Sequence, residues 1–204
     1  MWAVGHLALG YFAGKGVSKA LNERLNIPLL FFSSLAPDFD IIIPSLAHRG
    51  PTHSLIVYAL ALIPFYLVFG RKTLIYFASI SSHALVGDLL FTGGNLGVQI
   101  LWPLNSTWFL GPNLPAFTDV ILEGIFFSLF LIMAIKVRDL QKLFEPNPQN
   151  LVLTMPIFAI FMPVFLGFPV GTPFGLLIPH LVCLAILTYS IFLDLKSILI
   201  NKKS

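Results

Sequence analysis

Long apolar runs separated by short polar segments make up most of the chain. A helix needs about 20 apolar residues to cross a bilayer, with a range of roughly 17–25. The runs that approach this length are residues 2–14, 27–46, 54–70, 73–92, 118–137, 151–168 and 175–195. The first is the shortest, so we expect it to be tilted or only partly inserted. The pattern predicts an all-α, polytopic membrane helical bundle of about seven helices.

The composition excludes an ordinary soluble domain. Charged residues make up only 10% of the chain and hydrophobic residues 57%, whereas soluble domains average about 25% charged residues. The single cysteine, Cys183, excludes an internal disulfide and a metal site made of several cysteines. No basic stripe with interleaved aromatic residues is present, so we predict no nucleic-acid partner.

Basic residues sort to one side of the predicted bundle. If the apolar runs alternate in direction, eleven of the twelve Lys and Arg residues fall on the same side, and Arg49 is the exception. The positive-inside rule makes that side cytoplasmic, so we predict a multi-pass protein of the inner cell membrane. The eleven residues are Lys15, Lys19, Arg24, Arg71, Lys72, Lys136, Arg138, Lys142, Lys196, Lys202 and Lys203.

Almost every ionisable residue other than Lys and Arg lies at the opposite membrane level in this arrangement. Such side chains cost roughly a few kcal/mol each near the bilayer centre, so they are usually paired, hydrated or bound to a metal. Their convergence predicts one polar site on the extracytoplasmic side, near the lipid headgroups. They are His6, Asp38, Asp40, His48, His53, His83, Asp88, Asp119, Glu123 and His180.

The segment HRGPTHS, residues 48–54, holds two histidines around a Gly-Pro turn. Thr52 or Ser54 is placed to cap the next helix, with His53 at its first turn. The planar guanidinium of Arg49 suits a substrate phosphate. A salt bridge from Arg49 to Asp38 or Asp40 is an equally good interpretation.

The segment APDFD, residues 36–40, places two carboxylates two positions apart. On a regular helix Asp38 and Asp40 would point to different faces. They can share a site if the backbone is irregular, which Pro37 permits. The alternative is that Asp38 caps a helix and Asp40 pairs with Arg49.

The segment SHALVGD places His83 and Asp88 five positions apart. On an α-helix this spacing separates them by roughly 140°, which is a poor arrangement for binding one metal ion. A π-bulge, or a kink near Gly87, would bring the two side chains together. The alternative role for Asp88 is to cap the loop that follows.

Two further polar positions lie later in the chain. Asp119 and Glu123 share a helix face, and an acid such as Asp119 in the first turn favours the helix dipole. Glu123 lies deeper and is a candidate ligand or general base. His180 stands alone, which is more typical of a hydrogen-bonded core residue than of a ligand.

The donor atoms in this set are histidine nitrogens and carboxylate oxygens, without cysteine. That combination suits zinc or another divalent metal. The set is large enough for a site with two metal ions, which activates water for in-line attack on a phosphate ester. The candidate ligands are His6, Asp38, Asp40, His48, His53, His83 and Asp88.

Four segments in order, GHLALGYFAG, LAPDFD, HRGPTHSL and SHALVGD followed by GVQILWPL, resemble a known family. It comprises membrane-bound, metal-dependent hydrolases, also described as LexA-binding, inner-membrane-associated hydrolases, and is distantly similar to zinc-dependent phospholipases C. The resemblance covers residues 5–104. It implies divalent-metal binding by His6, Asp38, His53, His83 and Asp88. The family pattern has its acid four residues after the histidine, where this chain has five.

We therefore expect a single integral membrane domain over residues 1–204, with the metal site in residues 1–125 and residues 151–195 as an additional helix pair. The expected activity is zinc-type hydrolysis of a phosphoester of a phospholipid or polyprenyl phosphate, with membrane lipids as partners. His48 joins the five implied ligands as a candidate metal ligand, and the candidate catalytic groups are Asp40, Arg49 and Glu123. The alternatives are a structural or regulatory metal site and an ion transporter.

Overall fold

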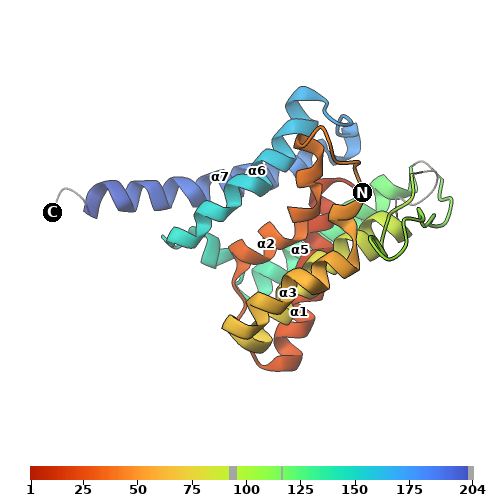
Figure 1. The fold of residues 1–204 in the computed structure, drawn as a ribbon. Helices are drawn as coiled ribbons and strands as arrows, with labels where there is room; N and C mark the ends of the chain where they lie inside the picture. The colour runs from red at the N-terminus through yellow and green to blue at the C-terminus, as the bar shows by residue number, and fades with distance from the viewer. Residues whose placement is uncertain (92–95, 116, 202–204) are drawn as a thin grey trace.

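The computed structural model describes residues 1–91, 96–115 and 117–201, which form helices joined by turns and one long loop (Figure 1). The α-helices are α1 (Ala3–Leu21), α2 (Ile27–Leu35), α3 (Leu55–Phe69), α4 (Thr73–Ser82), α5 (Thr118–Lys136), α6 (Thr154–Phe161) and α7 (Phe174–Asn201). The π-helices η4 (His83–Leu90) and η7 (Met162–Leu166) continue α4 and α6. The short 3₁₀-helices are η1 (Ala36–Ile42), η2 (Pro51–His53), η3 (Gly70–Lys72), η5 (Leu140–Phe144) and η6 (Pro148–Leu153).

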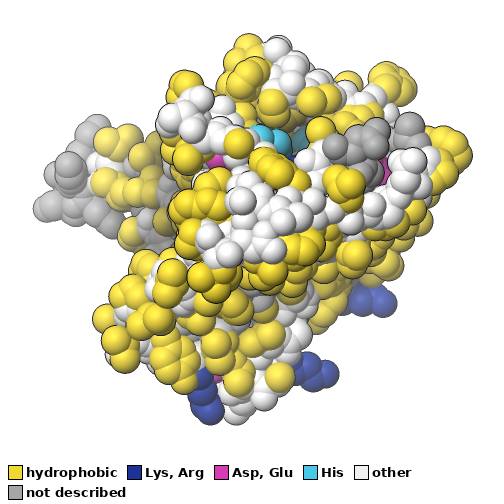
Figure 2. All heavy atoms as spheres, turned by 45° about the vertical axis from the view of Figure 1, so that its right-hand side comes forward, with side chains coloured by type: hydrophobic (Ala, Val, Ile, Leu, Met, Phe, Trp, Pro, Cys, Tyr) yellow, Lys and Arg dark blue, Asp and Glu magenta, His cyan; other side chains and the backbone are white. Residues whose placement is uncertain are grey.

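The all-α membrane architecture is confirmed. The described residues contain one isolated β-bridge, between Val98 and Phe109, and no strand. Among them, the helical segments long and apolar enough to cross a membrane are Leu55–Leu90, Thr118–Lys136, Pro148–Leu166 and Phe174–Leu199. Their outer faces are apolar, and hydrophobic side chains cover much of the surface in Figure 2. Seven membrane-crossing helices remain a prediction.

Helix α1 lies at the centre of the molecule rather than at its margin. It extends to Leu21, beyond the predicted run, and contacts α2, α4 and α5. Small residues allow this because a Cβ atom added at Gly10 would overlap Ser34, and one added at Gly14 would overlap Leu30. Close approach at small residues is how helices associate in a bilayer, where burial from water gives no driving force. The shortest of the predicted apolar runs, residues 2–14, therefore lies in the core of the molecule.

The apolar run over residues 27–46 is a regular α-helix only in its first half, and the irregular backbone that Pro37 permits follows it. Helix α2 ends at Leu35, and the chain continues as the 3₁₀-helix η1 with Pro37 in its first turn. Proline lacks an N–H donor and clashes with the preceding turn, so a regular α-helix cannot continue through it. The tighter backbone that results carries both Asp38 and Asp40.

A buried carboxylate links α1 to the turn after α5. Asp139 accepts hydrogen bonds from Tyr11 Oη at 2.9 Å, from Lys142 Nζ at 2.7 Å and from Lys15 Nζ. Burial alone would raise the pKa of Asp139, but the bonds from Lys142, Lys15 and Tyr11 outweigh it and hold that pKa below its ordinary value. We call Tyr11, Lys15, Asp139 and Lys142 the basic-end cluster.

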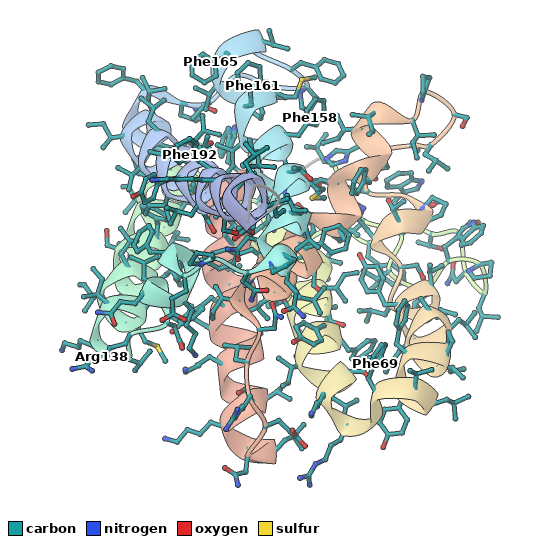
Figure 3. All side chains as sticks on the ribbon, turned by 90° about the vertical axis from the view of Figure 1, so that its left-hand side faces the viewer. Phe69, Arg138, Phe158, Phe161, Phe165 and Phe192 are labelled. Carbon is teal, nitrogen blue, oxygen red and sulfur yellow. The ribbon has the colours of Figure 1, made fainter. Side chains whose placement is uncertain are left out.

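The basic side chains visible on the surface lie away from the histidines, whereas Arg49 is buried beside them. In Figure 2 the visible Lys and Arg side chains are on the lower side of the molecule, and the visible histidine lies in a hollow near the top. In Figure 3, Arg138 lies far from the tip of α6 and η7, which Phe161 and Phe165 mark. Lys202 and Lys203, which entered the charge-sorting prediction, are outside the described residues.

Candidate metal centre

The structure brings the five ligands implied by the resemblance into one cluster. His6 comes from α1, Asp38 from η1, His53 from η2, and His83 with Asp88 from η4. Three overlapping groups have donor atoms within 4.8 Å of one another, and together they include all five residues and His48. We call His6, Asp38, His53, His83 and Asp88 the His/Asp cluster.

Four donor atoms form its centre. The Nε2 atoms of His53 and His83 are 3.2 Å apart, and each is 3.2 Å from Asp88 Oδ2. Asp38 Oδ1 lies 3.6 Å from His53 Nε2 and 3.3 Å from His83 Nε2. Zinc–nitrogen bonds of about 2.0–2.1 Å place tetrahedral ligands about 3.3 Å apart. The donor types and these five distances therefore suit a divalent ion held by the two imidazoles together with a carboxylate.

The π-helix η4 explains how His83 and Asp88 reach the same point. Its backbone hydrogen bonds join residues i and i+5, so side chains five positions apart, such as those of His83 and Asp88, lie on nearly the same face. The spacing that is wrong for an α-helix is thus right for the helix that forms here. The sequence analysis predicted a π-bulge as one solution, and the structure has it.

Partners behind each imidazole orient it toward the centre. The Nδ1–H of His83 donates to the backbone oxygen of Ser34 at 2.6 Å. The Nδ1 of His53 lies 3.1 Å from Thr52 Oγ1 and 3.3 Å from Asp40 Oδ2. In both rings Nε2 then carries the lone pair, which is the arrangement that metal-binding histidines adopt.

Asp40 lies behind His53 rather than at the centre. Its Oδ2 accepts hydrogen bonds from Thr52 Oγ1 at 2.6 Å and from the Arg49 backbone N–H at 3.2 Å, and its Oδ1 lies 2.9 Å from His48 Nδ1. Burial alone would raise the pKa of Asp40, but the bonds to His48, His53 and Thr52 hold that pKa well below its ordinary value. These contacts favour an orienting role over the predicted acid–base role.

His6 lies against the centre from α1. Its ring stacks on that of His83, with centroids 3.5 Å apart and planes 9° apart, and its Nε2 is 3.6 Å from Asp88 Oδ1. A Cβ atom added at Gly87 would overlap the His6 ring. Glycine at position 87 therefore allows α1 to bring His6 close to η4.

His48 occupies the rim of the cluster. Its side chain is 39% exposed, whereas those of His53 and His83 are fully buried. Because His48 Nδ1 is hydrogen-bonded to Asp40 Oδ1, the second ring nitrogen, Nε2, remains available to bind another group. Its position suits proton transfer as well as the predicted metal binding.

Arg49 pairs with a carboxylate that the sequence analysis did not assign to it. Its Nη2 lies 3.2 Å from Asp88 Oδ1, rather than at Asp38 or Asp40. The side chain is buried, and its Nε and Nη1 atoms have no hydrogen-bond partner within the described residues. Buried guanidinium donors are normally satisfied, so these two nitrogens indicate a place for an anionic group.

Two other predicted positions lie outside the cluster. Glu123 accepts a hydrogen bond from the Trp2 backbone N–H at 2.7 Å and thereby holds the first turn of α1 against α5. The structure does not bring it to the metal ligands. The Nδ1–H of His180 donates to the Leu176 backbone oxygen, 2.8 Å away, as predicted for a core histidine.

With the histidines neutral, the His/Asp cluster and the adjoining Asp40 together carry an excess of negative charge. Three carboxylates, those of Asp38, Asp40 and Asp88, are close to one guanidinium, that of Arg49. The amino group of Met1 is 3.9 Å from Asp88 Oδ1, and with it the sum is still negative. Buried charge is costly unless it is balanced, so a bound cation suits this environment.

A cavity of about 400 Å³ opens beside the cluster. Asp38, His48, Arg49 and Asp88 form its polar floor. Its walls come from η1 and from the segment through α6, η7 and residues 168–170. The sequence analysis missed these walls because residues 151–168 carry no polar signal. Pro163 and Gly167, which interrupt that run, were the available signals.

Comparison with known proteins finds the family but no individual relative. No curated protein and no solved structure matches the chain. A family model described as YdjM inner membrane protein matches residues 1–172, a range that includes every ligand of the cluster and every wall of the cavity. On this match, over most of its length, the chain belongs to the YdjM inner membrane protein family.

Proposed function

We propose that the protein is a membrane-bound, metal-dependent hydrolase of phosphoesters, with zinc as the metal. The spacing of the four central donor atoms, 3.2–3.6 Å between the imidazole nitrogens and their neighbours, is the observation that carries this proposal. The resemblance to zinc-dependent phospholipases C supports the same chemistry. His6 and His48 are further candidate ligands at the margin, which a second ion would use.

Each residue has a distinct part in the proposed reaction. His53, His83, Asp38 and Asp88 would hold the ion, which supplies polarisation of a phosphoryl oxygen and activation of water. Arg49 neutralises the negative charge of the ester through its unpaired nitrogens.

The remaining polar residues position the site and move the proton. His48, with Nδ1 held by Asp40, takes or returns a proton at Nε2. Asp40 keeps the rings of His48 and His53 in place.

The proposed site faces the extracytoplasmic side of the inner membrane. The basic residues that would mark the cytoplasmic side lie away from the histidines (Figure 2). A site at headgroup depth on the other side suits the phosphate of a phospholipid or a polyprenyl phosphate.

Metal content and turnover together test the proposal. Protein extracted in mild detergent should contain zinc, and it should hydrolyse at least one member of a panel of phosphomonoesters, phosphodiesters and lipid phosphates. Asp38→Ala and His53→Ala should lose the activity, while the control His180→Ala, which alters a buried histidine outside the cluster, should keep it. A zinc-loaded protein that is inert across the panel would contradict the hydrolase.

One observation favours a structural metal site as the second candidate. Two carboxylates and two imidazoles would supply four protein ligands, and structural zinc sites are closed in this way, whereas catalytic sites keep a position open. Asp38 is the more exposed of the two carboxylates at the cavity, with 16% of its side chain exposed against 2% for Asp88. If Asp38→Ala still binds zinc but loses hydrolysis, the enzyme is supported. If Asp38→Ala mainly lowers the unfolding temperature, the structural role is supported.

A further inference from the structure

We propose that the cavity beside the His/Asp cluster binds a membrane lipid with a phosphate head, its phosphate against Arg49 and its chain along the α6–η7 wall. This inference rests on the proposed function for the reaction, and it assigns the substrate class and the residues that select it. It gives a binding role to residues 155–170, which were predicted only to form part of an additional helix pair.

The floor of the cavity is suited to an anion. Arg49 lies there with Nε and Nη1 buried and without a partner in the described chain. One side of its guanidinium is fixed by Asp88 Oδ1 at 3.2 Å, so the direction of the other donors is set. His48 also lines the floor and adds a donor at the rim. A phosphate oxygen that accepts from Arg49 would lie next to the metal ligands Asp38 and Asp88.

The walls of the cavity are almost wholly apolar. One wall is the 3₁₀-helix η1, with Phe39 and Ile42. The facing wall is α6 and η7, with Phe158, Ala159 and Met162. A soluble phosphoester such as a sugar phosphate would leave its hydroxyl groups without partners on these walls, and unpaired buried polar groups are costly. An alkyl chain has no such groups.

The cavity also opens toward the lipid-facing surface. The outer parts of its walls are exposed, with 46% of Ile42 and 46% of Phe158 accessible. Phe158, Phe161 and Phe165 mark the same tip of α6 and η7 in Figure 3, and Phe161 contacts Phe165 at 4.8 Å between ring centroids. Drug-sized ligands occupy cavities of about 300–1,000 Å³, so about 400 Å³ holds a head and the first part of a chain, and the rest lies along this apolar tip.

Photocrosslinking tests this assignment without requiring turnover. The full-length protein in mild detergent is mixed with hexadecyl phosphate that carries a diazirine near the end of its chain. Labelled peptides should map to residues 155–170 and 39–42. Unlabelled hexadecyl phosphate should displace the probe, whereas hexadecanol and inorganic phosphate, each lacking one half of the ligand, should not.

Two variants address the chain and the head separately. Ala159→Trp fills the apolar wall and should lower labelling about tenfold, while Leu67→Trp, which adds the same ring at an exposed position of α3 outside the cavity, should leave it unchanged. Arg49→Gln should remove the preference for hexadecyl phosphate over hexadecanol. Zinc content measured in each variant shows that the cluster is intact.

Several outcomes would overturn the lipid site. They are labelling spread over the exposed faces of α3 and α5, displacement by hexadecanol as effective as by hexadecyl phosphate, and equal effects of Ala159→Trp and Leu67→Trp. Failure of the hydrolase is distinguishable from these. A chain that is labelled as described but hydrolyses nothing binds lipid phosphate without being the enzyme. A chain that hydrolyses soluble phosphoesters without labelling of the cavity is the enzyme without this lipid site.

Discussion

The molecule buries carboxylates in two places and surrounds them differently. In the basic-end cluster, one carboxylate, Asp139, receives hydrogen bonds from two ammonium groups and a phenol, so its oxygens are satisfied by the protein alone. In the His/Asp cluster, the carboxylates of Asp38 and Asp88 converge on the Nε2 atoms of His53 and His83, which face each other at 3.2 Å.

The difference separates a cluster that is complete within the protein from one that could hold a metal ion. Buried polar groups that the protein satisfies completely join elements together, as Asp139 joins α1 to the turn after α5. Buried histidines and carboxylates whose donor atoms converge on one point are candidates for a binding site. Both clusters are polar and both are buried, so burial and charge alone do not distinguish them. The orientation of donors and lone pairs does.

Removing a central imidazole should have the largest effect, a loss of metal binding at the His/Asp cluster. His83→Ala deletes a donor that lies within 3.3 Å of two carboxylates and of His53. We expect zinc affinity to fall more than about 100-fold, which corresponds to about 2.7 kcal/mol. Titration with a competing chelator measures this. Unchanged affinity in His83→Ala, with His180→Ala as the control, would show that the convergence does not bind metal.

Removing an orienting carboxylate should have the next largest effect. Asp40→Asn keeps the shape of the side chain but weakens its hold on His53 and His48. Partners behind metal-binding histidines change affinity about 10–100-fold, so a loss in that range is expected. The same chelator titration measures it. A loss as large as that of His83→Ala would mean that Asp40 is itself a ligand.

Closing the space beside His6 tests how tightly the cluster depends on helix packing. Gly87→Ala places a methyl group into the His6 ring, and overpacking of this kind costs about 1–3 kcal/mol. Thermal unfolding in detergent should show the loss, accompanied by weaker zinc binding. The matched control is Gly16→Ala, because nothing lies within 4 Å of a Cβ atom at that position. Equal behaviour of the two variants would argue against close approach of α1 and η4.

Neutralising the basic-end cluster should have the smallest effect, and on stability alone. Asp139→Asn should cost about 1 kcal/mol, since Lys15 and Lys142 are partly exposed and screened by water. The pKa of Asp139 is lowered by folding, so its contribution is present above the ordinary value of about 4 and is lost as the pH falls through the lower folded value. Unfolding temperatures of wild type and variant should therefore converge on acidification. A change in zinc content would show that the two clusters are coupled.

Much of the candidate site could be predicted from the order of short motifs. Intramembrane histidines and aspartates are costly, so their presence indicated a site before any coordinates were known. The spacing of His83 and Asp88 indicated either a π-bulge or a kink near Gly87, because no regular α-helix would bring both to one ion, and the structure has the π-helix. The role of Arg49 was left between a phosphate and the wrong carboxylates, since pairing between the turn before η2 and the π-helix η4 depends on packing and not on spacing.

The sequence by itself determined that this chain is helical, lies in a membrane and holds a histidine–carboxylate set at one level, because hydropathy and residue chemistry are local properties. Only the tertiary structure decided that α1 is central, that Asp40 stands behind His53, that Glu123 holds the start of α1, and that residues 155–170 form a wall of the cavity. Those outcomes depend on which small residues let helices approach and on which direction each side chain points after packing. The pattern of apolar and polar positions determines neither the close approach of helices nor the direction of the side chains.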